Sequence, residues 1–210
     1  MARLKKPVDY IAELQSSSDR NKRRVGEQLK MAYATWTKTL KTEDFLKFLE
    51  LIQRNKEKIG AAQFFGKFRA FSFEEYVYHV LKTRVRIPKS LNVFWGRRCK
   101  VSAGKNGVYG IEADIAIGVE DNAFIKPEIV VDAKVELDAS RLKTALASFM
   151  LVKAYNRKTR CFLVYIKREV DAALLKLARK WIDGIFEFNA EEKEVKKFIV
   201  AVQEALLQKL

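Results

Sequence analysis

The segment that decides the fold is Glu128-Ile129-Val130-Val131-Asp132-Ala133-Lys134-Val135. Its β-branched residues predict a strand. Because successive side chains of a strand point to opposite faces, Asp132 and Lys134 share a face with Val130. Ionised side chains are costly to bury unless they are paired or bound to a metal ion. The segment therefore predicts either a simple ion pair on a half-exposed edge strand or part of a charged site.

The preceding apolar segment, residues 111–119, predicts a neighbouring strand that carries a second carboxylate. Asp114 shares a face there with Ala116 and Gly118. We expect Asp114, Asp132 and Lys134 to form one cluster. Hard divalent ions such as Mg²⁺, for which Mn²⁺ can substitute, take oxygen ligands, and the two aspartates would supply them.

A divalent ion held in this way activates water and neutralises charge that builds up on a phosphate, as hydrolysis of a phosphodiester requires. Lys134 then has two possible roles, which the sequence leaves open: it holds the attacking water in line, or it stabilises the pentavalent phosphate. The sequence also leaves open whether one or two ions bind.

The flanking segments predict a mixed α/β fold. Upstream we expect a helix that Ser72 opens as the cap of a capping box with Glu75, then a strand from residue 91 toward 102 and a hairpin turn over 103–107. Downstream we expect a helix capped by Asp138 or Ser140, a strand over 161–166, and helices over 170–182 and 191–207. From Glu74 onward the predicted order is helix, three strands, helix, strand, helix, helix.

Residues 1–70 predict a separate helical region for DNA binding or dimerisation, and residues 71–210 the α/β core. Apolar residues recur in the first region at three- and four-residue intervals, and Thr42 is a suitable N-cap for one of its helices. We expect Trp36, Trp95 and Trp181 to be core residues rather than platforms for base stacking.

The charge distribution predicts a polyanionic partner. The formal net charge is +15, and residues 77–110 hold eight Lys and Arg with no Asp or Glu. A basic cluster is often only a solvated face, and that interpretation stays open. The candidates for contact with double-stranded DNA are Arg97, Arg98, Lys100, Lys105, Arg84 and Arg86, with Arg23 and Arg24 from the N-terminal region.

Several classes of site are not expected. A single histidine, His79, excludes the usual Ser/His/Asp and Cys/His mechanisms, and Cys99 and Cys161 form no zinc motif. The turn over 103–107 lacks the pattern of a phosphate-binding loop, so we expect no nucleotide cofactor. The chain has no signal-like start and no run of eighteen apolar residues, which predicts a cytoplasmic protein of prokaryotic type without membrane contact.

Asp114, a gap of seventeen residues and then Asp132-Ala133-Lys134 resemble the motif of the PD-(D/E)xK nuclease superfamily. The resemblance covers residues 71–166 and implies a restriction-endonuclease-like mixed β-sheet core flanked by helices. An acidic residue in a preceding helix often completes the metal site of that family, within a Gly…Phe-Glu pattern. Gly66…Phe73-Glu74 matches it loosely, so this role passes to Glu74, with Glu75 the alternative. Ala113 departs from the motif's proline.

Three functions follow as hypotheses. The first is a Mg²⁺-dependent, sequence-specific DNA endonuclease of the type II restriction kind, acting as a homodimer because two strands are cut. The second is a structure-specific nuclease of the Holliday-junction resolvase or repair type. The third is a non-catalytic basic nucleic-acid-binding protein in which Asp132 and Lys134 merely pair.

Overall fold

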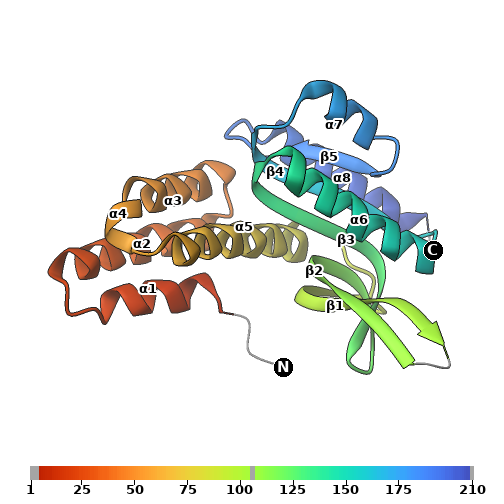
Figure 1. Cartoon of the computed structure of the whole chain (residues 1–210), viewed down its shortest axis with the longest axis horizontal. Helices are drawn as coiled ribbons and strands as arrows, with labels where there is room; N and C mark the ends of the chain where they lie inside the picture. The colour runs from red at the N-terminus through yellow and green to blue at the C-terminus, as the bar shows by residue number, and fades with distance from the viewer. Residues whose placement is uncertain (1–4, 105–106, 209–210) are drawn as a thin grey trace.

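The N-terminal part of the protein is helical, as predicted. The computed structural model describes residues 5–104 and 107–208. The first helices are α1 (Pro7–Gln15), α2 (Arg20–Thr39), α3 (Thr42–Arg54), α4 (Lys56–Ile59) and α5 (Ala62–Arg84). Figure 1 shows α1 to α4 gathered beside the N-terminal half of α5, with the β-sheet beside its other end. The predicted boundary between residues 70 and 71 falls inside α5, and the division into two regions stays a prediction.

The rest of the chain forms a five-stranded mixed sheet with helices on both faces, so the predicted α/β class is confirmed. The strands lie in the order β1-β2-β3-β4-β5. The pairs β1–β2 and β2–β3 are antiparallel, whereas β3–β4 and β4–β5 are parallel. The elements are β1 (Asn92–Gly104), β2 (Gly107–Asp121), β3 (Phe124–Leu137), α6 (Ala139–Tyr155), β4 (Arg160–Arg168), α7 (Ala172–Ala178), β5 (Gly184–Glu187) and α8 (Lys193–Leu207).

Two hydrophobic clusters cover the two faces of the sheet. One joins α5 and α8 to side chains such as Ile115 and Val131, and it also takes in α1, α2 and α3. The other packs α6 and α7 against Ala116 and Val130. Alternate residues of β2 and β3 thus enter opposite clusters, as the alternation in the sequence predicted.

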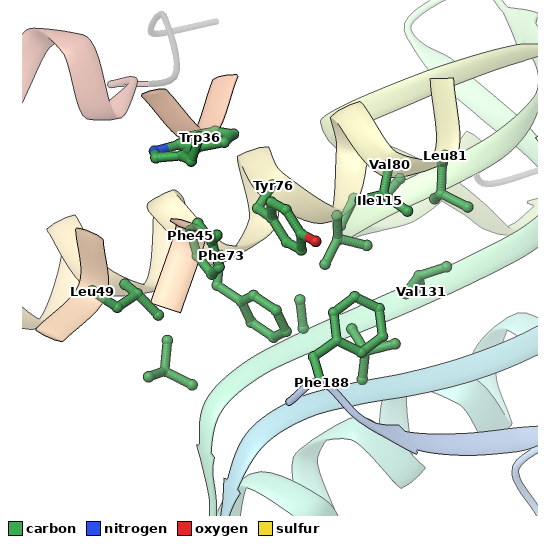
Figure 2. Close-up of a cluster of buried hydrophobic side chains, with 14 of the residues drawn as sticks. Trp36, Phe45, Leu49, Phe73, Tyr76, Val80, Leu81, Ile115, Val131 and Phe188 are labelled. Atoms are coloured by element: carbon green, nitrogen blue, oxygen red, sulfur yellow. The ribbon is translucent and has the colours of Figure 1, made fainter. Parts of the chain in front are cut away.

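Aromatic side chains connect the helical part to the sheet. The rings of Phe45 in α3 and Tyr76 in α5 stack with centroids 4.3 Å apart. Tyr76 also meets Phe188, which follows β5, edge to face at 6.3 Å. Figure 2 shows these side chains in one cluster with Val131 of β3. The face of α5 that carries Tyr76 is therefore buried from both sides.

The predicted capping box at Ser72 is wrong. Ser72 lies inside α5, fully buried, and its hydroxyl donates to the Phe68 carbonyl at 2.7 Å. Glu75 is buried and accepts hydrogen bonds from the Tyr33 hydroxyl, 3.1 Å from each carboxylate oxygen. The helix does not begin at Ser72 because it extends upstream, where apolar residues such as Phe65 and Phe68 are buried in the same hydrophobic cluster.

The other two cap predictions had different outcomes. Asp138 caps α6 by accepting from the Arg141 amide at 2.8 Å, as expected. Helix α3 begins at Thr42 itself, with Lys41 in the cap position. The Thr42 amide donates to Glu192 at 2.9 Å instead, so a carboxylate distant in sequence satisfies this helix end.

The sequence missed β5, and this error changes the order of elements at the C-terminus. The predicted helix over 170–182 is only α7, and the four residues of β5 follow before α8. A strand this short leaves no alternation to read. Trp181 just before it is 62% exposed, so its assignment to the core is wrong.

Two further expectations concern the strands and membranes. A hairpin turn was expected over 103–107: β1 ends at Gly104 and β2 begins at Gly107, and residues 105 and 106 lie outside the described residues. Among residues 5–104 and 107–208, no helix has the length and apolarity needed to cross a membrane.

Candidate active site

The candidate site lies where β2 and β3 separate. Their last paired residues are Ile115 and Val131. Beyond this pair, the Ala133 amide donates to Asp114 Oδ2 at 2.8 Å, so a side chain of β2 takes the place of a backbone acceptor. The separation therefore fixes the position of the Asp114 carboxylate between the two strands.

The structure brings Asp114, Asp132 and Lys134 together. Lys134 Nζ lies 3.0 Å from Asp114 Oδ2 and 2.6 Å from Asp132 Oδ1. All three side chains are at most about a quarter exposed. The ion-pair alternative placed Asp132 and Lys134 on an edge strand. That placement is wrong, because β3 lies between β2 and β4 inside the sheet. Both carboxylates thus point to the same position.

Crowding of the carboxylates shifts the protonation of this cluster. Burial, and then the Asp114 charge, raise the pKa of Asp132 to about 7. Burial alone would lower the pKa of Lys134, but the charges of Asp114 and Asp132 raise it above its usual value. The lysine therefore stays an ammonium ion, and a proton or another cation is favoured on Asp132 near neutral pH.

Glu74 of α5 is the third carboxylate of the region. It is buried, and Trp95 Nε1 of β1 donates to its Oε2 at 2.9 Å. Burial and then the charge of Asp114 raise the pKa of Glu74 well above its usual value, although Trp95 and Lys134 act in the opposite direction. Glu74 therefore interacts electrostatically with the strand cluster, while Trp95 holds one of its oxygens in position.

The donor set of the strand cluster fits a hard divalent ion. Two carboxylates from adjacent strands approach one point, at which Lys134 Nζ lies 3.0 Å from Asp114 Oδ2 and 2.6 Å from the buried Asp132 Oδ1. Mg²⁺ is held in proteins by one or two carboxylates together with water and substrate phosphate. Within the described ranges, no three acidic, histidine or cysteine side chains already converge tightly enough to ligate one ion. Asp114 and Asp132 are therefore the ligand pair that fits.

A second ion pair joins α5 to β3, and the sequence did not predict it. Arg69 of α5 bonds the Glu136 carboxylate, and both side chains are less than a quarter exposed. Trp95 was likewise missed as a partner of Glu74. Both contacts join residues more than twenty positions apart, so only the position of α5 against the strands reveals them.

Several basic residues proposed for DNA contact are partnered within the sheet. Arg97 bonds Glu120 at 2.6 Å, and Lys100 bonds Asp121 at 2.9 Å. Arg98 donates to the Gly110 carbonyl at 2.7 and 3.1 Å. These contacts hold the side chains along the β1–β2 hairpin, and a role in DNA binding stays a prediction.

The remaining basic candidates lie elsewhere. Arg84 bonds the Leu40 carbonyl and lies 3.5 Å from Glu192, so it connects α5 to the loops around it. Arg86 is exposed after α5, and its amide donates to Gln203 at 2.8 Å. Arg23 and Arg24 line an open cavity on α2. Lys105 lies outside the described residues.

The single histidine has no place in the carboxylate cluster. His79 lies one turn after Glu75 in α5, with its Nε2 4.0 Å from a Glu75 oxygen. Burial, followed by the charges of Lys82 and Lys6, lowers its pKa. Cys99 and Cys161 are buried, and burial raises the pKa of each thiol to about 12.

Comparisons with known proteins show what the fold of this chain is similar to. No family model and no curated protein matches the sequence. A solved structure, the low-resolution structure of the native BbvCI A2B2 tetramer, is similar with a TM-score of 0.61 at 12% identity. The likeness covers 97% of this chain and 97% of that chain, so it includes the helical N-terminal part. The chain therefore has the restriction-endonuclease-like fold, with a five-stranded mixed sheet flanked by helices.

Proposed function

We propose that the protein is a Mg²⁺-dependent DNA endonuclease of the PD-(D/E)xK kind, with its active site at Glu74, Asp114, Asp132 and Lys134. The observation that carries the proposal is the convergence of Asp114 and Asp132 on Lys134 Nζ at 3.0 and 2.6 Å where β2 and β3 separate. The restriction-endonuclease-like fold supports the assignment to a nuclease.

Each residue has a defined role in this proposal. Asp114 and Asp132 would hold the divalent ion, and the Ala133 amide orients the Asp114 carboxylate. When bound, Mg²⁺ supplies Lewis-acid stabilisation of the phosphate and lowers the pKa of water. Lys134 stays protonated beside the aspartates and donates either to the attacking water or to a phosphate oxygen. Glu74, anchored by Trp95, would supply a third carboxylate to the ion.

The partner in the proposal is double-stranded DNA, cut by two copies of the chain. The net charge of +15 favours a polyanion, because release of counterions from phosphates drives binding. The similar BbvCI chain belongs to an A2B2 tetramer. Cutting both strands of a duplex calls for two sites related by a twofold axis, which a homodimer supplies.

The test is incubation of the purified protein with a random duplex library, with and without Mg²⁺, followed by sequencing of the ends. We expect Mg²⁺-dependent ends that share a short sequence. A parallel incubation with branched and flapped DNA distinguishes the structure-specific alternative, which would cut these and leave plain duplexes intact. Binding without any new ends under all conditions would favour the non-catalytic alternative and reject the proposal.

A further inference from the structure

A cavity of about 530 Å³ lies between α5 and the edge strand β1. This volume falls within the range of about 300–1,000 Å³ that is common for small-ligand sites. Its lining combines aromatic and cationic side chains: Tyr78, Phe94, Trp95, Lys6, Lys82 and Arg97. We call it the α5–β1 pocket.

The aromatic wall of the α5–β1 pocket comes from both elements. The rings of Tyr78 in α5 and Trp95 in β1 lie 6.0 Å apart, inclined by 32°. Both residues are only partly buried. Nucleobases stack on aromatic faces whatever their sequence, because every base has a π-face. The wall therefore suits a flat heteroaromatic group.

Positive charge surrounds that wall. Lys82 Nζ lies 5.3 Å from the Tyr78 ring centroid, one helical turn further along α5. The charges of Lys82 and of Lys6, which precedes α1, both lower the pKa of His79 in α5, after the larger effect of burial. Arg97 closes the β1 side, with its guanidinium 5.9 Å from the Phe94 ring. A phosphate attached to the stacked group would meet these cations.

The pocket also holds two polar groups able to bond the edge of a base. Glu75 is buried at the pocket and is held by the Tyr33 hydroxyl at 3.1 Å. His79 lies 4.0 Å from it and is about two-fifths exposed. A carboxylate and an imidazole offer acceptor and donor atoms in fixed positions, which is what discrimination between bases requires.

The α5–β1 pocket adjoins the candidate active site through one side chain. Trp95 lines the pocket, and its indole nitrogen donates to Glu74 Oε2. Glu75 of the pocket is the next residue along α5 after Glu74. The Trp95 side chain would thus lie between an occupant of the pocket and Glu74.

We propose that the α5–β1 pocket binds one nucleotide turned out of the DNA duplex, with its base against Tyr78 and Trp95 and its phosphate against Lys82 and Lys6. The pocket is then a specificity site beside the catalytic one. This inference rests on the proposed function for the identity of the polymer, whereas occupation of the pocket is measurable without catalysis.

The test follows the three indole N–H signals of the full-length protein by nitrogen-15 NMR, without metal. Trp95→Phe assigns the Trp95 signal, and exposed Trp181, which lies between α7 and β5, serves as internal control. Titration uses the four deoxynucleoside 5′-monophosphates, with inorganic phosphate and the deoxynucleosides in separate arms. We expect the Trp95 signal to shift with affinities that differ among the bases, while Trp181 stays in place.

Variants locate the binding. Tyr78→Ala should weaken nucleotide binding about tenfold through lost stacking. Lys82→Ala should weaken nucleotides and leave the weaker nucleoside binding unchanged. The matched control is Lys143→Ala, an exposed lysine of α6, which should have no effect.

Several outcomes would overturn the inference. An unmoved Trp95 signal, an equal shift with inorganic phosphate, or wild-type affinity in Tyr78→Ala would each do so. Nucleotide binding in a protein that never cleaves DNA would reject the proposed function and leave the pocket standing. Cleavage by a protein whose Trp95 signal ignores every nucleotide would reject the pocket alone.

Discussion

Asp132 is a carboxylate buried beside another carboxylate, and the charge of Lys134 offsets only part of the cost of burying it. Its pKa of about 7, against an ordinary value of 3.8, means that the folded state binds a proton which the unfolded state has released. Between about pH 4 and pH 7 the folded state therefore binds more protons through this group, and its contribution to stability falls as the pH rises.

Asp132→Asn removes that cost. Without metal, we expect the variant to be more stable than the wild type at pH 8 by about 1–3 kcal/mol, since a shift of one pKa unit corresponds to about 1.4 kcal/mol and the Lys134 ion pair is lost as well. At pH 4, where Asp132 is protonated in the folded state, the difference should vanish or reverse. Urea unfolding in EDTA at both pH values measures it. An equal difference at both would show that the charge of Asp132 is not responsible.

The residues of the candidate site divide into those that the sequence could place together and those that it could not. Asp132 and Lys134 lie two apart in one strand, so alternation alone puts them on one face. Asp114 joined them because its strand directly precedes theirs in the chain. The Trp95 bond to Glu74 depends on how α5 crosses β1, and no local pattern in the sequence encodes that crossing.

The pairing of β2 with β3 is irregular at Gly118, and the close approach of the two backbones there requires a glycine. The register between β2 and β3 shifts between Ile117 and Gly118. A Cβ atom on Gly118 would lie 2.1 Å from the Lys126 carbonyl oxygen and 3.0 Å from Pro127 Cα. Both neighbours are backbone atoms of β3, which cannot move aside as a side chain can.

Gly118→Ala should therefore destabilise the protein, by about 1–3 kcal/mol as is usual for overpacking. Gly66→Ala is the matched control, because Gly66 is an exposed position in α5 where an added Cβ atom would meet nothing within 4 Å. It should stabilise the helix by about 0.5–1 kcal/mol. Chemical denaturation of both variants gives the comparison. Equal effects of the two substitutions would contradict the close approach of the strands.

Element prediction from the sequence succeeded for long periodic segments and failed where distant contacts decide. The strands β1 to β4 and helix α6 were expected in their observed order. The start of α5 was misplaced because Ser72 and Glu75 match a capping box locally. In the structure the Ser72 hydroxyl donates to the Phe68 carbonyl one turn earlier, and the Glu75 carboxylate accepts from the Tyr33 hydroxyl of α2.

On the scale of the whole molecule, the helical part and the sheet share one hydrophobic cluster. It contains residues of α1, α2 and α3 together with residues of α5, the sheet and α8. Phe45 and Tyr76 stack within it, and Trp36 is fully buried there. The sequence predicted the two regions but not that one core would join them, since the apolar stripe of α3 does not say which surface it covers.

Removal of residues 1–61 should therefore prevent stable folding of the remainder. The truncated chain keeps α5 but exposes the side of Tyr76 that Phe45 covers, together with its neighbours in the cluster. We expect loss of a cooperative thermal transition by circular dichroism. A fragment 62–210 that unfolds cooperatively at the melting temperature of the whole protein would show that the sheet is stable by itself.

The most direct measurement is cleavage of a supercoiled plasmid carrying random inserts, in Mg²⁺, by the wild type and by Asp114→Asn, Asp132→Asn and Lys134→Ala. Glu43→Gln, which changes only an exposed ion pair with Lys47, is the control. We predict nicking and linearisation by the wild type and the control, and a loss of at least about a hundredfold in each of the other three with DNA binding retained. Cleavage by all of them at the wild-type rate would contradict the assignment of the active site.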